Sequence, residues 1–361
     1  QVKAAVTLGY QQPFVIKDVE VAPPGKDEIL VKIVATGVCH TDAVMRDNPG
    51  VVPMPAILGH EGAGIVASVG EAVSGIRVGD HVVLSYAACH HCENCLSTHP
   101  SACEDFNTLN FGGRREDGTT PYRLGDQDLS LFFGQSSFSQ YVVTRASNAV
   151  VVDPEVDLTL LGPLGCGIQT GSGTVLNRLK PVVGESLVVF GCGAVGLSAI
   201  MAAKLTGCSQ IIAVDIHASR LALARELGAT HQINGKEQDA VAVIKQITGK
   251  GAHYAVETTG VSAIVLQAVH AVKPLGTVAI VGFTGDITLN VQNDLMAEGK
   301  SLVGVIEGDA VPALFIPRLV QLYKQGKFPI DKLIARYPLA DINQAFADSA
   351  SGKVIKPVVV M

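Results

Sequence analysis

The sequence predicts an α/β protein in which a compact, barrel-like β module accompanies a doubly wound parallel sheet. The first observation is the rhythm of residues 185–305, where short apolar runs alternate with helical stretches. The second is the region up to about residue 85, where short apolar runs are separated by prolines and glycines and no long helix is indicated. The third is the length of 361 residues, which suggests two or three domains.

Composition narrows the class of protein. A hydrophobic content of 48% and a charged content of 17% are typical of a globular chain with sizeable cores. The net charge of −6 is spread without a basic block, which argues against nucleic-acid binding. No apolar run reaches the roughly 18 residues of a membrane span. The first residues do not resemble a signal peptide, so we expect a cytoplasmic protein with eight reduced cysteines.

The doubly wound part begins at Ser186–Phe190, a continuous apolar run typical of a strand buried on both faces. A helix is expected directly after it, up to about Thr206. The next strand is Ile211–Asp215, and the next helix, Ala218–Leu227, ends at Gly228. The remaining strands and helices are expected, in alternation, at 231–233, 239–247, 254–256, 262–272 and 277–281.

A G-x-G-x-x-G motif lies between the first of these strands and its helix, which is the context that dinucleotide binding requires. Its glycines, Gly191, Gly193 and Gly196, allow a tight turn and let a pyrophosphate rest on the helix N-terminus near Ala194. Asp215 ends the following strand and can hold the ribose hydroxyls of an adenosine. A carboxylate repels a 2′-phosphate, which favours NAD over NADP, although Arg220 nearby weighs the other way. The alternative is a glycine turn without a ligand.

Four cysteines form a C-x2-C-x2-C-x7-C run: Cys89, Cys92, Cys95 and Cys103. Four thiolates so close in sequence can complete a tetrahedral structural zinc site. An iron–sulfur cluster is the main alternative, but the C-x3-C-P continuation of the bacterial ferredoxin motif is absent. Plain or disulfide-bonded cysteines are a further alternative. We therefore expect zinc here.

Two further cysteines and a histidine, Cys39, His60 and Cys166, offer a second metal-binding set. Two thiolates and an imidazole are ligands of catalytic zinc sites that keep a fourth position open. Each residue alone would more often be an ordinary buried side chain. Because they are 21 and 106 residues apart, only the folded chain can bring them together.

The segment from Glu104 to Phe138 is expected to be irregular, and a loop this long is often functional. Aromatic residues in and near it either line a substrate cleft or pack in the core, and the sequence does not decide between these: Tyr86, Phe111, Phe132, Phe133 and Phe138.

Taken together, these motifs resemble those of the zinc-dependent medium-chain alcohol dehydrogenases. The resemblance rests on Gly37–Asp42, Gly59–Gly64, Gly165–Gly167, the four-cysteine run, and Gly191–Gly196 with Asp215. Residues 161–171 and 132–138 are similar to the bacterial aryl-alcohol and geraniol dehydrogenases of that family. The resemblance implies a GroES-like catalytic domain of residues 1–167 and 306–361, and a Rossmann NAD-binding domain of residues 168–305. It also implies an active site in the cleft between them and a homodimer or homotetramer.

The resemblance assigns roles to individual residues. Catalytic zinc would be bound by Cys39, His60 and Cys166, and Glu61 would approach the metal during ligand exchange. Asp42 would orient His60, and Thr41 would take the proton from the alcohol. The residues expected to contact NAD are His40, Thr170, Gly191, Gly193, Ala194, Val195, Gly196, Asp215, Arg220 and Lys356. Val44 replaces the histidine that relays protons in many members, so we expect the ribose to pass its proton to water directly.

The predicted function is reversible hydride transfer from a primary aromatic or allylic alcohol, such as benzyl alcohol, to NAD, with two zinc ions per subunit. The alternative enzyme is a short-aliphatic alcohol or glutathione-dependent formaldehyde dehydrogenase. A catalytically silent zinc- and nucleotide-binding protein is the alternative of another class. The intact second ligand set argues against it.

Overall fold

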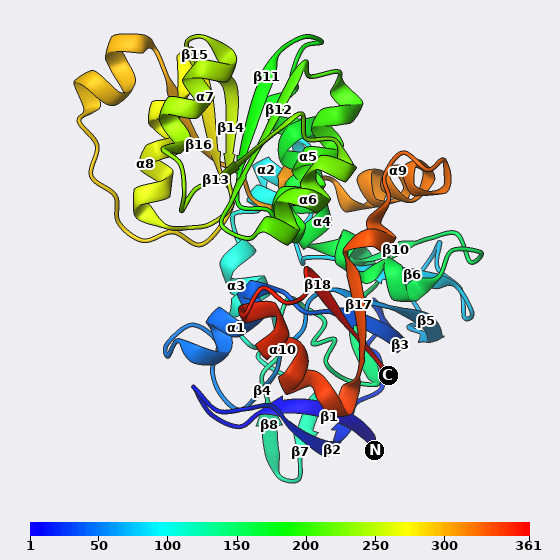
Figure 1. Cartoon of the computed structure of the whole chain (residues 1–361). Coiled ribbons are helices and arrows are strands. Elements are labelled where there is room, and N and C mark those ends of the chain that lie inside the picture. The colour runs from blue at the N-terminus through cyan, green and yellow to red at the C-terminus, as the bar shows by residue number, and fades with distance from the viewer. The chain divides into compact units, whose positions relative to one another are not determined.

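The computed structural model describes residues 1–361, which form two compact units (Figure 1). One unit consists of residues 1–166, 311–325 and 330–361, and the other of residues 167–310 and 326–329. The predicted fold class, with one β-rich unit and one doubly wound unit, is confirmed. The domain boundaries expected from the resemblance, at residues 167 and 306, stay a prediction.

The first unit contains a five-stranded sheet in the order β4-β1-β2-β7-β8. Its strands are β1 (Val2–Thr7), β2 (Val15–Val21), β4 (Ala56–Ile57), β7 (Tyr122–Leu124) and β8 (Gln127–Leu129). The segment 104–138 was expected to be irregular, and this expectation is wrong in part. Strands β7 and β8 and helix α3 (Phe106–Phe111) lie within it, because β7 pairs with β2 and β8 closes a hairpin with β7.

A seven-stranded sheet completes the barrel-like part of this unit, in the order β10-β6-β5-β3-β18-β17, with β9 also paired to β3. Its strands are β3 (Glu28–Gly37), β5 (Gly62–Val69), β6 (His81–Leu84), β9 (Tyr141–Arg145), β10 (Ala149–Val151), β17 (Ile334–Pro338) and β18 (Lys356–Val360). Two register shifts between β3 and β5 mark irregularities that bend such a pair. The expected return of the C-terminal tail to this module is confirmed, since β18 pairs with β3.

Five helices belong to the first unit: α1 (His40–Asp47), α2 (Glu93–Leu96), α3, α9 (Pro312–Lys324) and α10 (Ile342–Ala350). Helix α10 packs on β18. The hydrophobic core joins the inner faces of the strands to the aromatic segment 132–138 and includes side chains with no exposed surface, such as Ile29, Ile57 and Phe138. Burial of this apolar surface is the main stabilising contribution to such a unit.

The second unit is built on a six-stranded parallel sheet in the order β13-β12-β11-β14-β15-β16. Its strands are β11 (Ser186–Phe190), β12 (Gln210–Asp215), β13 (His231–Asn234), β14 (Ala252–Glu257), β15 (Val272–Ile280) and β16 (Ser301–Gly304). All five residues of β11 are buried, as the apolar run predicted. Successive strands are added on one side of β11 up to β13 and on its other side from β14 onward. The carboxyl ends of the strands at this reversal form the switch point at which such sheets bind ligands.

The helices of the second unit are α4 (Gly167–Gly173), α5 (Ala194–Thr206), α6 (Ala218–Leu227), α7 (Ala240–Thr248) and α8 (Ser262–Ala271). Helix α5 packs against α6, and α7 against α8. The alternation predicted from the sequence is confirmed, although β15 starts five residues before the expected Thr277. None of the helices is both long and apolar enough to span a bilayer.

Candidate metal centre and cofactor site

Residues that are far apart in the sequence meet in the first unit. Cys39 precedes α1, His60 lies between β4 and β5, and Cys166 follows the turn Gly162–Gly165. One ligand atom from each of these residues, together with a carboxylate oxygen of Glu61, forms a group in which all atoms lie within 4.8 Å of one another. Folding therefore brings the second predicted ligand set to one place.

The donor atoms of this group fit a zinc ion. The Nε2 atom of His60 is buried and has no hydrogen-bond partner. A buried imidazole nitrogen is rarely left unpartnered, and here two cysteine sulfur atoms are its neighbours. Two thiolates and one imidazole nitrogen are a ligand set that zinc prefers. The residues present therefore suit the metal that the sequence predicted.

Proton affinities in the group are strongly shifted. The side chain of Cys166 hydrogen-bonds to Cys39 and, with the charges of Lys356 and His60, holds the pKa of Cys39 well below its ordinary value despite burial. Burial disfavours the charged form of His60, but the Asp42 carboxylate and the Cys39 thiolate outweigh it and hold the pKa of His60 well above its usual range. At a pH below this raised pKa, a metal ion that binds here has to displace a proton from the histidine.

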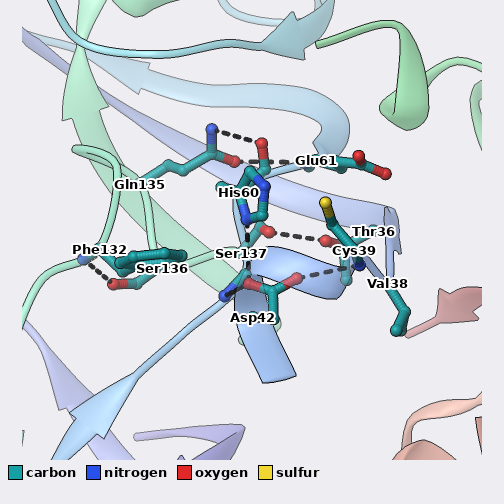
Figure 2. A network of polar contacts seen from close by, with 12 residues as sticks. Thr36, Val38, Cys39, Asp42, His60, Glu61, Phe132, Gln135, Ser136 and Ser137 are labelled. Atoms are coloured by element: carbon teal, nitrogen blue, oxygen red, sulfur yellow. Dashed lines mark hydrogen bonds and ion pairs between the residues drawn. The ribbon is translucent and has the colours of Figure 1, made fainter. Parts of the chain in front are cut away.

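Asp42 orients the ring of His60 (Figure 2). Its Oδ1 atom accepts hydrogen bonds from His60 Nδ1 at 2.9 Å and from the main chain of Gly59 at 3.1 Å. Its Oδ2 atom accepts from the main chain of Cys39 at 3.1 Å. A carboxylate on Nδ1 keeps the proton on that nitrogen and leaves Nε2 free as a ligand.

Lys356 lies against Glu61. Its Nζ atom is 3.1 Å from Glu61 Oε1 and 3.2 Å from Oε2, and it donates to the carbonyl of Val38 at 2.9 Å. Both side chains are buried. Burial disfavours the lysine's charge, but Glu61 and the Cys39 thiolate raise the pKa of Lys356 above its usual range. The ammonium group expected at the cofactor pyrophosphate thus has a carboxylate partner within the first unit, and its contact with NAD stays a prediction.

Two aromatic rings enclose His60. Phe133 stacks on the imidazole with ring centroids 4.6 Å apart and an interplanar angle of 27°, and Phe132 meets it edge-on at 5.4 Å. Of the five aromatic residues left undecided by the sequence, Tyr86, Phe132, Phe133 and Phe138 are at most 4% exposed and belong to the core, against which Phe111 packs. Core packing is therefore their structural role, and Phe132 and Phe133 also shape the surroundings of the metal centre.

Three further residues that the resemblance singled out, Thr41 for catalysis, His40 for the cofactor and Val44 in place of the relay histidine, lie on α1. His40 is exposed, Thr41 is partly buried, and Val44 packs against the hydrophobic core.

The four-cysteine run also converges. The sulfur atoms of Cys89, Cys92, Cys95 and Cys103 lie within 4.8 Å of one another, and none is in a disulfide. Main-chain amides point at them: Cys89 donates to the sulfur of Cys103 at 3.3 Å, and Cys92 donates to that of Cys89 at 3.3 Å. Amides of Glu104 and Cys95 lower the pKa of Cys92 to about 6. Four thiols with amide donors suit a structural zinc ion.

In the second unit the glycine motif forms a close turn between β11 and α5. A side chain at Gly196 would lie 1.7 Å from the carbonyl oxygen of Gly191, so only glycine fits there. A side chain at Gly193 would meet nothing nearer than the Arg220 guanidinium at 4.0 Å, which leaves room for a ligand at the start of α5. This matches the expected cradle for a pyrophosphate.

Asp215 lies beside this turn. Its Oδ2 atom accepts from the main chain of Cys192 at 2.7 Å, and its Oδ1 atom accepts from that of His217 at 2.8 Å. Each oxygen keeps a further lone pair for a ribose hydroxyl. The Nε atom of Arg220 is buried and has no hydrogen-bond partner. The expected adenosine-binding residues therefore meet at one end of the parallel sheet.

Helix α4 brings Thr170 to the same end of the second unit. Helix α4 packs on α5, and a side chain at Gly171 would lie 2.0 Å from the carbonyl oxygen of Val195. Thr170 is 8% exposed and its carbonyl accepts from Thr174. The two residues expected beside the nicotinamide, Thr170 and Val195, thus lie on neighbouring helices.

Sequence reasoning missed a set of buried polar side chains around the metal centre, chiefly Gln135, Ser137 and Ser85. The signal for Gln135 and Ser137 was the run of polar residues 135–137 between Phe133 and Phe138, and Ser85 had no such signal. It also missed a cavity of about 380 Å³ in the first unit, next to Leu131, Gly134 and Arg115, whose lining includes none of the three expected metal ligands.

Comparisons with known proteins agree with this arrangement. The model of the alcohol dehydrogenase GroES-like domain matches residues 25–154, and that of the zinc-binding dehydrogenase matches residues 194–324. A geraniol dehydrogenase of Castellaniella defragrans is 44% identical, over 99% of this chain and 97% of that protein.

Two solved structures are also similar over the whole chain. The benzyl alcohol dehydrogenase of Acinetobacter calcoaceticus is 47% identical with a TM-score of 0.96, covering 100% of this chain and 99% of that one. An alcohol dehydrogenase zinc-binding domain protein of Burkholderia ambifaria is 50% identical with a TM-score of 0.97, covering 100% and 98%. With its GroES-like and Rossmann folds and its two clusters of potential metal ligands, the chain belongs to the zinc-binding medium-chain alcohol dehydrogenase family.

Proposed function

We propose that this alcohol dehydrogenase reversibly oxidises primary aromatic or allylic alcohols, such as benzyl alcohol, to their aldehydes with NAD as the hydride acceptor. The observation that carries the proposal is the unpartnered Nε2 atom of His60 beside the thiols of Cys39 and Cys166. The relatives named for geraniol and benzyl alcohol support this substrate class. Both alcohols carry their hydroxyl on a CH2 group that is attached to an unsaturated carbon, so both give conjugated aldehydes.

Each residue of the centre has a proposed task. Cys39, His60 and Cys166 hold zinc, which when bound supplies a Lewis acid that favours ionisation of an alcohol hydroxyl. Asp42 keeps the His60 ring in the tautomer that can bind a metal. Thr41 would take the proton from the alcohol hydroxyl, and because Val44 stands in place of a relay histidine, that proton would reach water without help from a further side chain. Glu61 would be the carboxylate available to a bound metal during ligand exchange, since one of its oxygens lies within 4.8 Å of the three ligand atoms.

We propose NAD as the cofactor because of the carboxylate of Asp215. Its two oxygens are held by main-chain amides beside the glycine turn, where a 2′-phosphate would meet a fixed negative charge. Gly191, Gly193, Ala194 and Gly196 would receive the pyrophosphate. Arg220, His40 and Lys356 would supply positive or donor groups for it, and Thr170 and Val195 would flank the nicotinamide.

The proposed stoichiometry is two zinc ions per subunit, with the structural ion bound by Cys89, Cys92, Cys95 and Cys103. We further propose a cytoplasmic homodimer or homotetramer. Strand β16 supports the oligomer because it is the edge of the parallel sheet, and one side of its ladder has no paired strand. An open edge of this kind readily pairs with a second copy.

An assay of NADH absorbance tests the substrate and the cofactor together. Purified protein should reduce NAD with benzyl alcohol or geraniol, should reduce it poorly with ethanol, and should prefer NAD to NADP. Activity with ethanol but not with benzyl alcohol would favour a short-aliphatic enzyme. Absence of activity with every alcohol, in protein that contains both zinc ions, would refute the proposal.

A further inference from the structure

The loop formed by residues 132–138 is hydrogen-bonded to the main chain just before His60. The amide of Ser137 donates to the carbonyl of Gly59 at 3.1 Å, and the amide of Phe138 donates to that of Leu58 at 3.1 Å. Gly59 has a φ of +92°, and a side chain there would lie 2.6 Å from the amide nitrogen of Phe138, so the two segments are in direct contact. The loop is thus hydrogen-bonded to the residues immediately before the expected ligand.

Gln135 extends this support to the residues after His60 (Figure 2). Its Nε2 atom donates to the carbonyl of His60 at 3.2 Å, and its Oε1 atom accepts from the amide of Gly62 at 3.1 Å. One buried side-chain amide therefore spans Glu61 by binding the main chain on both sides of it. The side chain of Gln135 has no exposed surface, so water cannot replace these bonds.

The same amide is linked to the segment that carries Cys166. Gln135 Nε2 also lies 3.4 Å from the carbonyl of Ser85, and Ser85 Oγ donates to the carbonyl of Gly165 at 2.8 Å. Ser85 is 1% exposed. Gly165 directly precedes Cys166, so two side chains, Gln135 and Ser85, connect the main chains of two expected zinc ligands that are 106 residues apart.

We propose that Gln135 is a positioning residue of the metal centre. It holds the main chain of His60 directly and that of Cys166 through Ser85, and so sets the separation of these two expected ligands. Asp42 fixes the ring of His60 from its Nδ1 side, and Gln135 fixes the backbone from which the ring projects. The inference rests on the proposed zinc site. It concerns residues of the first unit alone and requires no contact with alcohol or NAD.

A buried amide that only satisfied nearby polar groups in the core would contribute to folding stability but would not affect metal binding. Three features distinguish Gln135 from such a group. Its partners come from separate segments, each holds a ligand or leads to one, and the loop that carries it contains left-handed residues at Phe133 (φ 51°) and Ser136 (φ 60°). Non-glycine residues in that region are strained and cluster at functional sites.

The test measures zinc release by the holoenzyme. Gln135→Leu removes all three contacts, and Gln135→Glu keeps the shape but turns a carboxylate toward the carbonyls of His60 and Ser85. Loss of a partner that supports a ligand weakens metal binding by about 10–100-fold. We therefore expect release of the catalytic zinc to a chelator to be faster by a factor in that range, with the four-cysteine zinc retained. The visible spectrum of cobalt bound at Cys39, His60 and Cys166 should also change.

Asn110→Leu is the matched control. Asn110 is also wholly buried, and its amide accepts from the main chain of Ala87 and donates to the carbonyls of Ala87 and Phe106, each at 2.9 Å. This variant should lose thermal stability but keep the wild-type release rate of the catalytic zinc and the wild-type cobalt spectrum. Those two readouts therefore separate positioning of the metal from stability of the fold.

Ser85→Ala provides a milder variant that tests the same chain of contacts if Gln135→Leu folds poorly. It should accelerate zinc release in the same direction, and its effect should be less than additive with that of Gln135→Glu, because both act through one network. Unchanged zinc release and cobalt spectra in the Gln135 variants and in Ser85→Ala would overturn the inference alone. Wild-type protein without zinc at Cys39, His60 and Cys166 would overturn the proposed function together with it.

Discussion

The Nδ1 atom of His60 lies 2.9 Å from Oδ1 of Asp42, and both side chains are wholly buried. Asp42 also accepts main-chain hydrogen bonds from Cys39 and Gly59, so one carboxylate binds to both segments that approach the metal centre from the N-terminal part of the chain.

Asp42→Asn should weaken zinc binding at Cys39, His60 and Cys166 by about 10–100-fold, because the neutral amide no longer fixes the imidazole tautomer. Zinc content after dialysis against a graded series of chelator concentrations measures the effect. The four-cysteine zinc serves as an internal reference in the same samples. Equal retention of both ions by the variant and the wild type would contradict the role of Asp42.

Zinc affinity at the catalytic centre should depend steeply on pH. The carboxylate of Asp42 and the thiolate of Cys39 raise the pKa of His60 against the effect of burial, so below that raised pKa the imidazole carries a proton on the nitrogen that must bind the metal. Affinity should therefore increase as the pH rises toward the pKa of His60 and should level off above it. Competition with a chelator across a pH series measures this, and calorimetry in two buffers counts the protons released.

Asp42→Asn offers a control for that pH dependence. It removes the main charge that raises the pKa of His60, so the rise in zinc affinity should occur at lower pH. If zinc affinity rose over the same pH range in both proteins, a group other than His60 would be responsible for the pH dependence.

Lys356→Met should destabilise the metal-free protein by roughly 3–5 kcal/mol, because it leaves the buried carboxylate of Glu61 without its cation. Combining it with Glu61→Gln should recover most of the lost free energy of unfolding, as measured by chemical denaturation. A single variant as stable as the wild type would contradict the importance of the pair. In the stable double variant, an unchanged KM for NAD would contradict the proposed contact of Lys356 with the pyrophosphate.

Asp215→Asn should reduce kcat/KM with NAD by about 10–100-fold, the loss expected for a hydrogen bond of about 1.5–3 kcal/mol to a charged group. The same change should improve the relative use of NADP, because the repelling charge is gone. Steady-state rates with both cofactors measure the ratio. Arg220→Ala in the Asp215→Asn background should then reduce the use of NADP, and a ratio indifferent to both changes would refute the assignment of the adenosine site.

Where neighbouring residues carry the information, the sequence was enough. The buried strand Ser186–Phe190, the glycine turn after it and the carboxylate at the end of the next strand follow a local pattern, so the fold of this unit could be predicted, and the same pattern names candidate cofactor residues. The four cysteines are likewise close in sequence. For Cys39, His60 and Cys166, the residue types were informative only in combination with their surrounding motifs.

The sequence alone determined the fold class, through periodicity and glycine spacing, and the family, through the resemblance of its motifs, and it supplied candidate residues for binding metal and nucleotide through their ligand chemistry. Only the tertiary structure decided that Lys356 pairs with Glu61, that Phe132 and Phe133 enclose His60, and that Gln135 hydrogen-bonds to the main chain of His60. Lys356 and Glu61 are 295 positions apart in the sequence, and Gln135 and His60 are 75 positions apart. The partner of a buried polar group depends on which distant segment the packing of the core brings to it, and no local pattern specifies that segment.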